Sequence, residues 1–289
     1  MQTAESRHVE QLLRKCSTSL KRLNEDIGTT WANRRKPMGI IDHRDMCRFL
    51  REEPIDSIQL VGRGIHRPWQ LGFDNGYKVG LITCDTALFK TIRSIEETNY
   101  YKKSTDRSVT SPERELAAYA LDRALQFNLV PPTVWREVFD LGYGVVQAWV
   151  SAPLAIDWYE SGYDYRKDYE NPWLHLLCAF DFIIGSLDRH AANWIIDTFH
   201  RVYAIDNGYS FVKDDYREWF KCNVGRRFKD QPIHPLVKAE LDSIDPQVIP
   251  VALRPFGFRC GEIEGAMTRL SELKGKKVWD IEDGRWSTS

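Results

Sequence analysis

The sequence contains no window that approaches the roughly 20 consecutive apolar residues of a membrane-spanning helix. Its first residues are polar and charged and lack the apolar centre of a signal peptide. Neither sign of charge is in excess, because 40 basic residues balance 41 acidic ones, so composition gives no strong attraction to nucleic acid or to an anionic membrane. These absences predict a soluble, cytoplasmic protein with no nucleic-acid partner.

Cysteine is sparse and never clustered. No Cys-x-x-Cys pair occurs, which excludes the usual zinc-binding and disulfide-scaffold patterns; the six cysteines are Cys16, Cys47, Cys84, Cys178, Cys222 and Cys260. Isolated thiols fit a reducing compartment. The 289 residues are 43% hydrophobic and include ten tryptophans, which predicts a well-packed globule with a large core.

The most informative stretch is an apolar run followed by a polar turn and two short apolar segments. The run Leu174 to Ile184 predicts a buried helix, which leads into the polar turn at residues 187–192. The segments 194–196 and 202–205 predict the two strands of a hairpin. The residues that flank such a hairpin lie close together.

Three polar residues surround this hairpin. Asn193 precedes its first strand, Asp206 follows its second, and Asp188 lies on the turn just upstream. Two oxygen ligands beside a further carboxylate suit magnesium-assisted phosphoryl transfer. Taken singly, each motif is more typical of a solvated turn or a hairpin-closing turn. Their combination around one hairpin favours a functional site.

The same residues carry a family resemblance. Asp188-Arg-His-Ala-Ala-Asn193 resembles the catalytic loop of the atypical kinases related to phosphoinositide 3- and 4-kinases, a superfamily that includes HipA-type and actin-fragmin kinases. Asp206-Asn-Gly208 resembles the metal-binding Asp-x-Gly element, and the phrase from Ala204 to Gly208 is similar to type II phosphatidylinositol 4-kinases. The resemblance implies an α+β, bilobal protein-kinase-like fold. Its expected parts are a helical extension (1–55), an N-lobe with hinge (56–150) and a C-lobe (151–289).

The resemblance also implies roles in the C-lobe. Asp188 would accept the proton of the attacking hydroxyl, while Arg189 or His190 would stabilise the loop or the developing charge. Asn193 and Asp206 would hold Mg²⁺ on ATP. Asp181, inside the apolar helix, would brace the catalytic loop.

Lys90 and Glu115 are the expected phosphate-binding pair of the N-lobe. Lys90 lies in the predicted strand 87–92, where a charged side chain is costly unless an anion faces it; an edge lysine that reaches water is the alternative. Phe89-Lys90 resembles the Phe-Lys-Pro of type II lipid kinases, with Thr91 in place of proline. Glu115 follows a predicted helix start at Ser111, with serine as N-cap, and either pairs with Lys90 or complements the helix dipole.

Other segments predict the rest of the fold. Strands are expected at residues 58–61, 77–83, 129–134 and 144–150, where Pro131 and Pro132 indicate a sheet edge or a strand entry. By resemblance, the backbone of residues 147–150 would bind the adenine edge.

Within this predicted hinge, Gln147, Trp149 and Val150 are the candidate nucleotide-binding residues; a plain core strand is the alternative. An amphipathic helix is expected over residues 8–27. Residues 209–230 correspond to an activation loop, either contacting an acidic substrate or simply solvated.

These features predict a phosphotransferase that uses ATP and Mg²⁺ and transfers the γ-phosphate to a hydroxyl. A protein serine or threonine is the favoured acceptor and a phosphoinositide headgroup the alternative. A nucleotide-binding pseudokinase that acts as an interaction module, or an enzyme that transfers AMP, are further alternatives.

Overall fold

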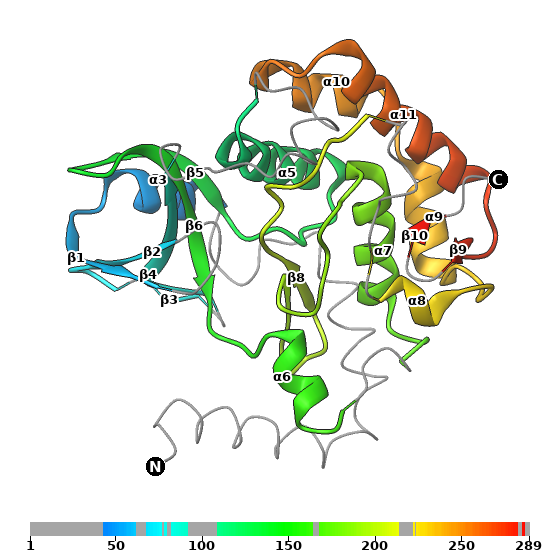
Figure 1. The fold of residues 1–289 in the computed structure, drawn as a ribbon, viewed down its shortest axis with the longest axis horizontal. Coiled ribbons are helices and arrows are strands. Elements are labelled where there is room, and N and C mark those ends of the chain that lie inside the picture. The colour runs from blue at the N-terminus through cyan, green and yellow to red at the C-terminus, as the bar shows by residue number, and fades with distance from the viewer. Residues whose placement is uncertain are drawn as a thin grey trace.

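The structure is a computed structural model of the chain. It describes residues 43–61, 68–76, 78–79, 82–91, 109–163, 168–213, 222, 224–282 and 285–286. The helix expected over residues 8–27 lies outside them. Figure 1 shows two lobes, a β-sheet with one helix against it and a larger body made mainly of helices. This is the α+β, bilobal architecture that the family resemblance implied. Within the described residues, no helix has the length and apolarity needed to cross a membrane.

The N-lobe is built on a six-stranded antiparallel sheet with the order β1-β2-β4-β6-β5, in which β3 pairs with β4. The strands are β1 (Ile55–Leu60), β2 (Trp69–Phe73), β3 (Lys78–Val79), β4 (Ile82–Thr91), β5 (Thr133–Val138) and β6 (Gly142–Val150). Strand β5 begins directly after Pro131 and Pro132 and lies at the sheet edge, as the two prolines indicated.

Three features of this sheet differ from the sequence prediction. The strand expected at residues 129–134 lies further along the chain, since β5 begins at Thr133 and ends at Val138. Strand β2 was not predicted, and β4 is one strand where the sequence predicted a strand at 77–83 and a separate one at 87–92. The polar residues between Thr83 and Ala87 interrupt the apolar pattern, but a register shift at that point of the β4–β6 pairing keeps the strand continuous. The alternation of apolar residues alone does not reveal such an irregularity.

Helix α3 (His43–Glu52) packs against the sheet. Its Met46 and Leu50 are buried in one cluster with Phe89 of β4 and Val146 of β6. The N-lobe core therefore includes a segment that the predicted boundary at residue 55 assigned to the extension.

Helix α5 (Ser111–Leu125) connects the two lobes. Its N-cap is Thr110, whose side chain accepts from the backbone N–H of Glu113, while the Glu113 carboxylate accepts from the Thr110 N–H at 2.6 Å. The prediction of Ser111 as N-cap was wrong by one residue. Only Thr110 has a glutamate three positions later, as a capping box requires. The box fixes where the helix starts, and so fixes the position of Glu115.

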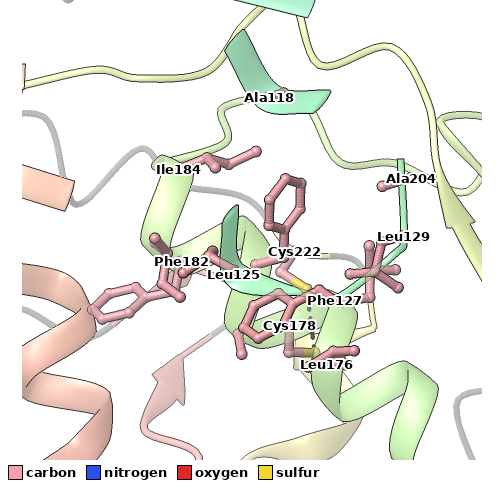
Figure 2. Close-up of a cluster of buried hydrophobic side chains, with 14 of the residues drawn as sticks. Ala118, Leu125, Phe127, Leu129, Leu176, Cys178, Phe182, Ile184, Ala204 and Cys222 are labelled. Atoms are coloured by element: carbon pink, nitrogen blue, oxygen red, sulfur yellow. Dashed lines mark hydrogen bonds between the residues drawn. The ribbon is translucent and has the colours of Figure 1, made fainter. Parts of the chain in front are cut away.

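The C-lobe core surrounds α7 (Pro172–Ile184), whose 13 residues are all buried. The other helices are α6 (Ala155–Glu160), α8 (Gly225–Phe228), α9 (Pro235–Ser243), α10 (Val248–Leu253) and α11 (Cys260–Gly275), with a short pair of strands, β9 (Ile281–Glu282) and β10 (Arg285–Trp286). Figure 2 shows part of this core, where the Sγ of Cys222 lies 3.4 Å from the Sγ of Cys178.

The predicted hairpin is present as β7 (Trp194–Ile196) and β8 (Val202–Ala204), with Trp194 opposite Ala204. It lies between the sheet of the N-lobe and α7 (Figure 1). All six strand residues are buried. The hairpin therefore lies where the apolar pattern of these short segments predicted it.

Candidate active site

A tight loop connects α7 to the hairpin. The helix ends at Gly185, whose left-handed backbone (φ 59°) turns the chain. The Asp188 carbonyl accepts from the His190 N–H at 2.8 Å and from the Asn193 side-chain amide at 2.8 Å. The loop is thus held by its own hydrogen bonds, and Asp188 and Asn193 are fixed at its two ends.

Asp188 and His190 are the accessible side chains of this loop. The Asp188 side chain is 42% exposed and that of His190 is 53% exposed. The two approach one another, with 3.7 Å between His190 Nε2 and Asp188 Oδ2. A carboxylate that a solvent-borne hydroxyl can reach has the placement that a general base needs.

Arg189 points the other way, into the protein. It is 1% exposed, and its Nε donates to Asp181 Oδ1 at 2.9 Å. Its Nη1 donates to the carbonyls of Asn193 and Ile205, and its Nη2 to the side chain of Asn207. Of the two roles expected for Arg189, this geometry fits stabilisation of the loop.

Asp181 lies opposite Arg189 and is fully buried. Burial raises the pKa of Asp181 to about 6, against the opposing effect of the Arg189 guanidinium. The pair is a buried salt bridge that joins α7 to the loop that follows it. Asp181 therefore braces the loop from within the helix.

The hairpin brings the two predicted metal ligands to one end of the site. The Ile205 N–H donates to the Asn193 carbonyl at 3.1 Å, so Asn193 and Asp206 flank one closed end of the hairpin. Asp206 has a left-handed backbone (φ 55°), which aspartate tolerates better than most residues. Its carboxylate accepts from Lys90 Nζ at 2.8 Å.

Lys90 is held between two carboxylates. It donates to Glu115 of α5 and to Asp206, and its side chain is 17% exposed. Burial disfavours its charge most strongly, but the two carboxylates together outweigh burial and hold the pKa of Lys90 above its ordinary value. The Glu115 Oε2 also accepts from the Asn207 N–H at 2.8 Å. Glu115 therefore joins β4, α5 and the Asp-Asn-Gly segment.

The neighbouring strand allows this arrangement through a glycine. Gly144 of β6 lies so close to β4 that a Cβ there would be 2.3 Å from the Lys90 carbonyl and 2.7 Å from the Phe89 ring. Both contacts are with a backbone or a buried ring, so no larger residue fits without displacing β4. Glycine at this position keeps Lys90 in the sheet register that reaches α5.

The three expected hinge residues do not occupy equivalent positions. Gln147 pairs with Leu88 on one side and with Thr133 on the other, and its side chain donates to Thr133 Oγ1 at 3.0 Å. It is a residue of the sheet interior. The pairing between β5 and β6 ends at Gln147, opposite Thr133, the first residue of β5. Trp149 and Val150 lie beyond this point of β6.

Oxygen donors suited to a cation are present, although the described residues contain no cluster of three or more histidine, cysteine or acidic side chains. The side-chain nitrogen of Asn193 donates to the Asp188 carbonyl, and its side-chain oxygen is the atom that can ligate a cation. That oxygen and the Asp206 carboxylate are two hard ligands, the set that Mg²⁺ uses when phosphate oxygens and water complete its shell. The residues fit the ion.

Sequence reasoning missed two residues of the site. Asn207 bridges Glu115 and Arg189, and it lies inside a motif of which only the aspartate and glycine were singled out. Arg114 is fully buried beside Glu115. Its position could have indicated it: Arg114 lies three residues before Ala117 and four before Ala118, and so shares the apolar face of the predicted helix.

Comparisons with known proteins identify a family and a fold. The family described as "Phosphatidylinositol 3- and 4-kinase" matches residues 5–240. The Golgi casein kinase with Mn/ADP bound is similar in structure, with 15% identity, a TM-score of 0.51 and coverage of 81% of this chain and 74% of that one. A second structure of the Golgi casein kinase has 14% identity, a TM-score of 0.50 and the same coverage.

A third solved structure, the Helicobacter pylori proinflammatory kinase CtkA, has 12% identity and a TM-score of 0.44, covering 80% of this chain and 94% of that one. Comparison with curated protein sequences gave no significant match. The structural likeness to the Golgi casein kinase shows a kinase fold, and the family match covers most of the chain. The chain therefore belongs to the phosphatidylinositol 3- and 4-kinase family and is a phosphotransferase that acts on hydroxyl groups.

Proposed function

We propose that the protein transfers the γ-phosphate of ATP, with Mg²⁺, to the hydroxyl of a protein serine or threonine. The observation that carries this proposal is the connected set of charges at the hairpin. Lys90, Glu115 and Asp206 contact one another, and Asp188 is exposed on the adjoining loop. Phosphoryl transfer requires two things of the protein: a cation that neutralises the charge of the phosphates and a carboxylate that accepts a proton.

In this proposal, Lys90 contacts the phosphates and Glu115 holds it in place. Asn193 and Asp206 hold Mg²⁺, which, when bound, neutralises charge on the phosphate oxygens. Asp188 accepts the proton of the attacking hydroxyl, and His190, 3.7 Å away, assists its orientation. Arg189 acts as a positioning residue through its contacts with Asp181 and both metal-ligand segments.

Two observations bear on the nucleotide and the acceptor. The Golgi casein kinase is named for a protein substrate and was solved with Mn/ADP, which supports nucleotide, divalent metal and protein for this chain. The family description supports phosphatidylinositol as a second candidate acceptor. Trp149 and Val150 are the proposed adenine neighbours, because they extend past the cover of β5.

A cytoplasmic location is part of the proposal. Cys47, Cys178, Cys222 and Cys260 are all free thiols. The Cys222 thiol donates to the Cys178 sulfur at 3.4 Å and no disulfide joins them, which supports a reducing compartment.

The test offers purified wild type and the Asp188→Ala variant ATP labelled separately at the α- and γ-phosphates. Casein as a generic protein acceptor and vesicles containing phosphatidylinositol are supplied in parallel. Label from the γ-position on protein, absent in the variant, is the expected result. The same label on lipid would instead favour phosphatidylinositol as the acceptor. Label only from the α-position would replace the kinase by an AMP transferase, and ATP binding without any transfer would favour a pseudokinase.

A further inference from the structure

Arg114 is an arginine without any exposed surface, one residue before Glu115 on α5. Its Nη1 donates to the carbonyl of Ser210 at 2.8 Å and to that of Phe211 at 3.1 Å. Its Nη2 donates to Glu262 Oε1 at 3.0 Å. A buried guanidinium is retained only where its donors are matched. Its Nε donates to the nearby Val109 carbonyl at 3.3 Å, and the other matching groups come from two distant parts of the chain.

Arg114 and Glu115 hold the same stretch of backbone at two points. Glu115 accepts from the N–H of Asn207, and Arg114 donates to the carbonyls three and four residues later. Gly208 lies between these points, and a Cβ there would be 2.0 Å from Ser111 Oγ at the start of the same helix. The first turns of α5 therefore clamp the segment that begins with the proposed metal ligand Asp206.

Glu262 supplies the counter-charge from a helix near the C-terminal end. It lies in the first turn of α11, is fully buried, and its Oε2 accepts from the Arg259 N–H at 3.3 Å. Helix α10, just before α11, packs along α5 (Figure 1). Residues 260–275 follow the end of the family match at residue 240. The acid that neutralises Arg114 thus comes from outside the matched region.

The buried pair has a consequence for the nucleotide site. Helix α5 carries Glu115, whose reach to Lys90 depends on where the helix lies relative to the Asp-Asn-Gly segment. Arg114 sets the distance between α5 and this segment through the Ser210 and Phe211 carbonyls. Glu262, fully buried beside it, pairs with the guanidinium at 3.0 Å and holds it in alignment.

We propose that Arg114 and Glu262 are positioning residues that hold α5 where Glu115 engages Lys90. Helix α11, beyond the matched family region, thereby controls nucleotide affinity. The inference rests on the proposed function in one respect, that ATP binds at Lys90. The contact between Lys90 and Glu115 can be measured without ATP, which separates the two claims.

The experiment compares wild type with Arg114→Met, Glu262→Leu and the double variant. Thermal unfolding reports stability, and mass spectrometry of the chain after brief treatment with an amine-acylating reagent reports protection of Lys90. Affinity for Mg·ATP is measured by calorimetry. Each single variant leaves one buried charge without its partner, whereas the double variant removes both. We expect the double variant to recover much of the unfolding temperature lost in Arg114→Met.

If Arg114 positions α5, the double variant should regain unfolding temperature but not the protection of Lys90 from acylation. Acylation of Lys90 should be at least about fivefold faster in both Arg114→Met and the double variant, with Mg·ATP affinity about tenfold weaker, because neither can hold the Ser210 and Phe211 carbonyls. Return of both quantities to wild-type values in the double variant would overturn the proposal and leave a purely structural pair.

Two further variants keep the test decisive. Arg114→Lys retains the charge but replaces the fork by a single ammonium that cannot serve Glu262 and both carbonyls, so it should lose protection of Lys90 even if Arg114→Met does not fold. Glu264→Gln removes an exposed carboxylate two residues from Glu262 and should match wild type. Wild type that protects Lys90 but does not bind ATP would refute the proposed function and the control of nucleotide affinity, and would leave only the positioning of α5 against Lys90 standing.

Discussion

Replacing Glu115 by glutamine removes one negative charge from between Lys90 and the backbone of Asn207. In the wild type, one carboxylate oxygen accepts from Lys90 and the other from the Asn207 N–H. Glutamine has one oxygen for these two donors and turns an NH₂ group toward the other. With Glu115 only 2% exposed, water cannot replace the lost acceptor.

The magnitude follows from the hydrogen bond that is lost. A hydrogen bond to a charged group contributes about 1.5–3 kcal/mol. Lys90 keeps its contact with Asp206, so the lysine stays in the site but is held at one point instead of two. Since 1.4 kcal/mol corresponds to a factor of ten, we expect kcat/KM for Mg·ATP to fall by about 10- to 100-fold. The pKa of Lys90 should move down, because burial is then less fully opposed.

Steady-state kinetics at fixed acceptor, with varied Mg·ATP, measures the effect. Glu113→Gln is the matched control, because it removes a charge from the same helix turn while glutamine keeps the capping box with Thr110. The control should retain wild-type kcat/KM within about twofold. Equal kcat/KM for Glu115→Gln and the control would refute the reasoning.

Asp206→Ala should weaken Mg·ATP binding and raise the magnesium concentration needed for half-saturation, as titration with magnesium would reveal; an unchanged titration would exclude Asp206 as a ligand. Burial raises the pKa of Asp122 from 3.8 to about 7. The folded protein binds this proton more tightly than the unfolded chain does. The contribution of Asp122 to the free energy of unfolding therefore falls as pH rises from 3.8 through about 7. The unfolding free energy of wild type relative to Asp122→Asn should therefore fall over this window, by up to about 1.4 kcal/mol per pH unit; a constant difference would contradict the shift. Cys260, which is exposed, should react with a maleimide in the native protein, whereas Cys178 should react only after unfolding, as peptide mapping would show.

The C-lobe part of the site was accessible to sequence reasoning because its signals are local. A long apolar run must be buried, and a short apolar hairpin necessarily brings together the residues on either side of it. These two rules located Asp188, Asn193 and Asp206, and the structure has the helix and hairpin at the predicted positions. The start of α5 was off by one residue because two hydroxyl residues compete as N-cap and a glutamate decides between them.

The remaining features depend on partners that are remote in sequence. Arg114 and Glu262 are 148 residues apart, and neither has a neighbour that announces the other. Arg189 belongs to a motif that suggests chemistry, yet its role is fixed by carbonyls and by Asp181 in the folded protein. Strand β2 was missed because five residues with a glycine among them carry little pattern. Such pairings depend on the tertiary fold, which one sequence does not display.

The most direct test of the account is a comparison of wild type and Asp188→Asn in two measurements on the same samples. Calorimetry gives the affinity for Mg·ATP, and rapid mixing gives the single-turnover rate of γ-phosphate transfer to the acceptor found above. The account predicts affinities equal within about twofold and a rate at least about 100-fold lower in the variant, because a general base contributes roughly 10²–10⁴ in rate. A variant that transfers phosphate at the wild-type rate would contradict the assignment of Asp188 as the base.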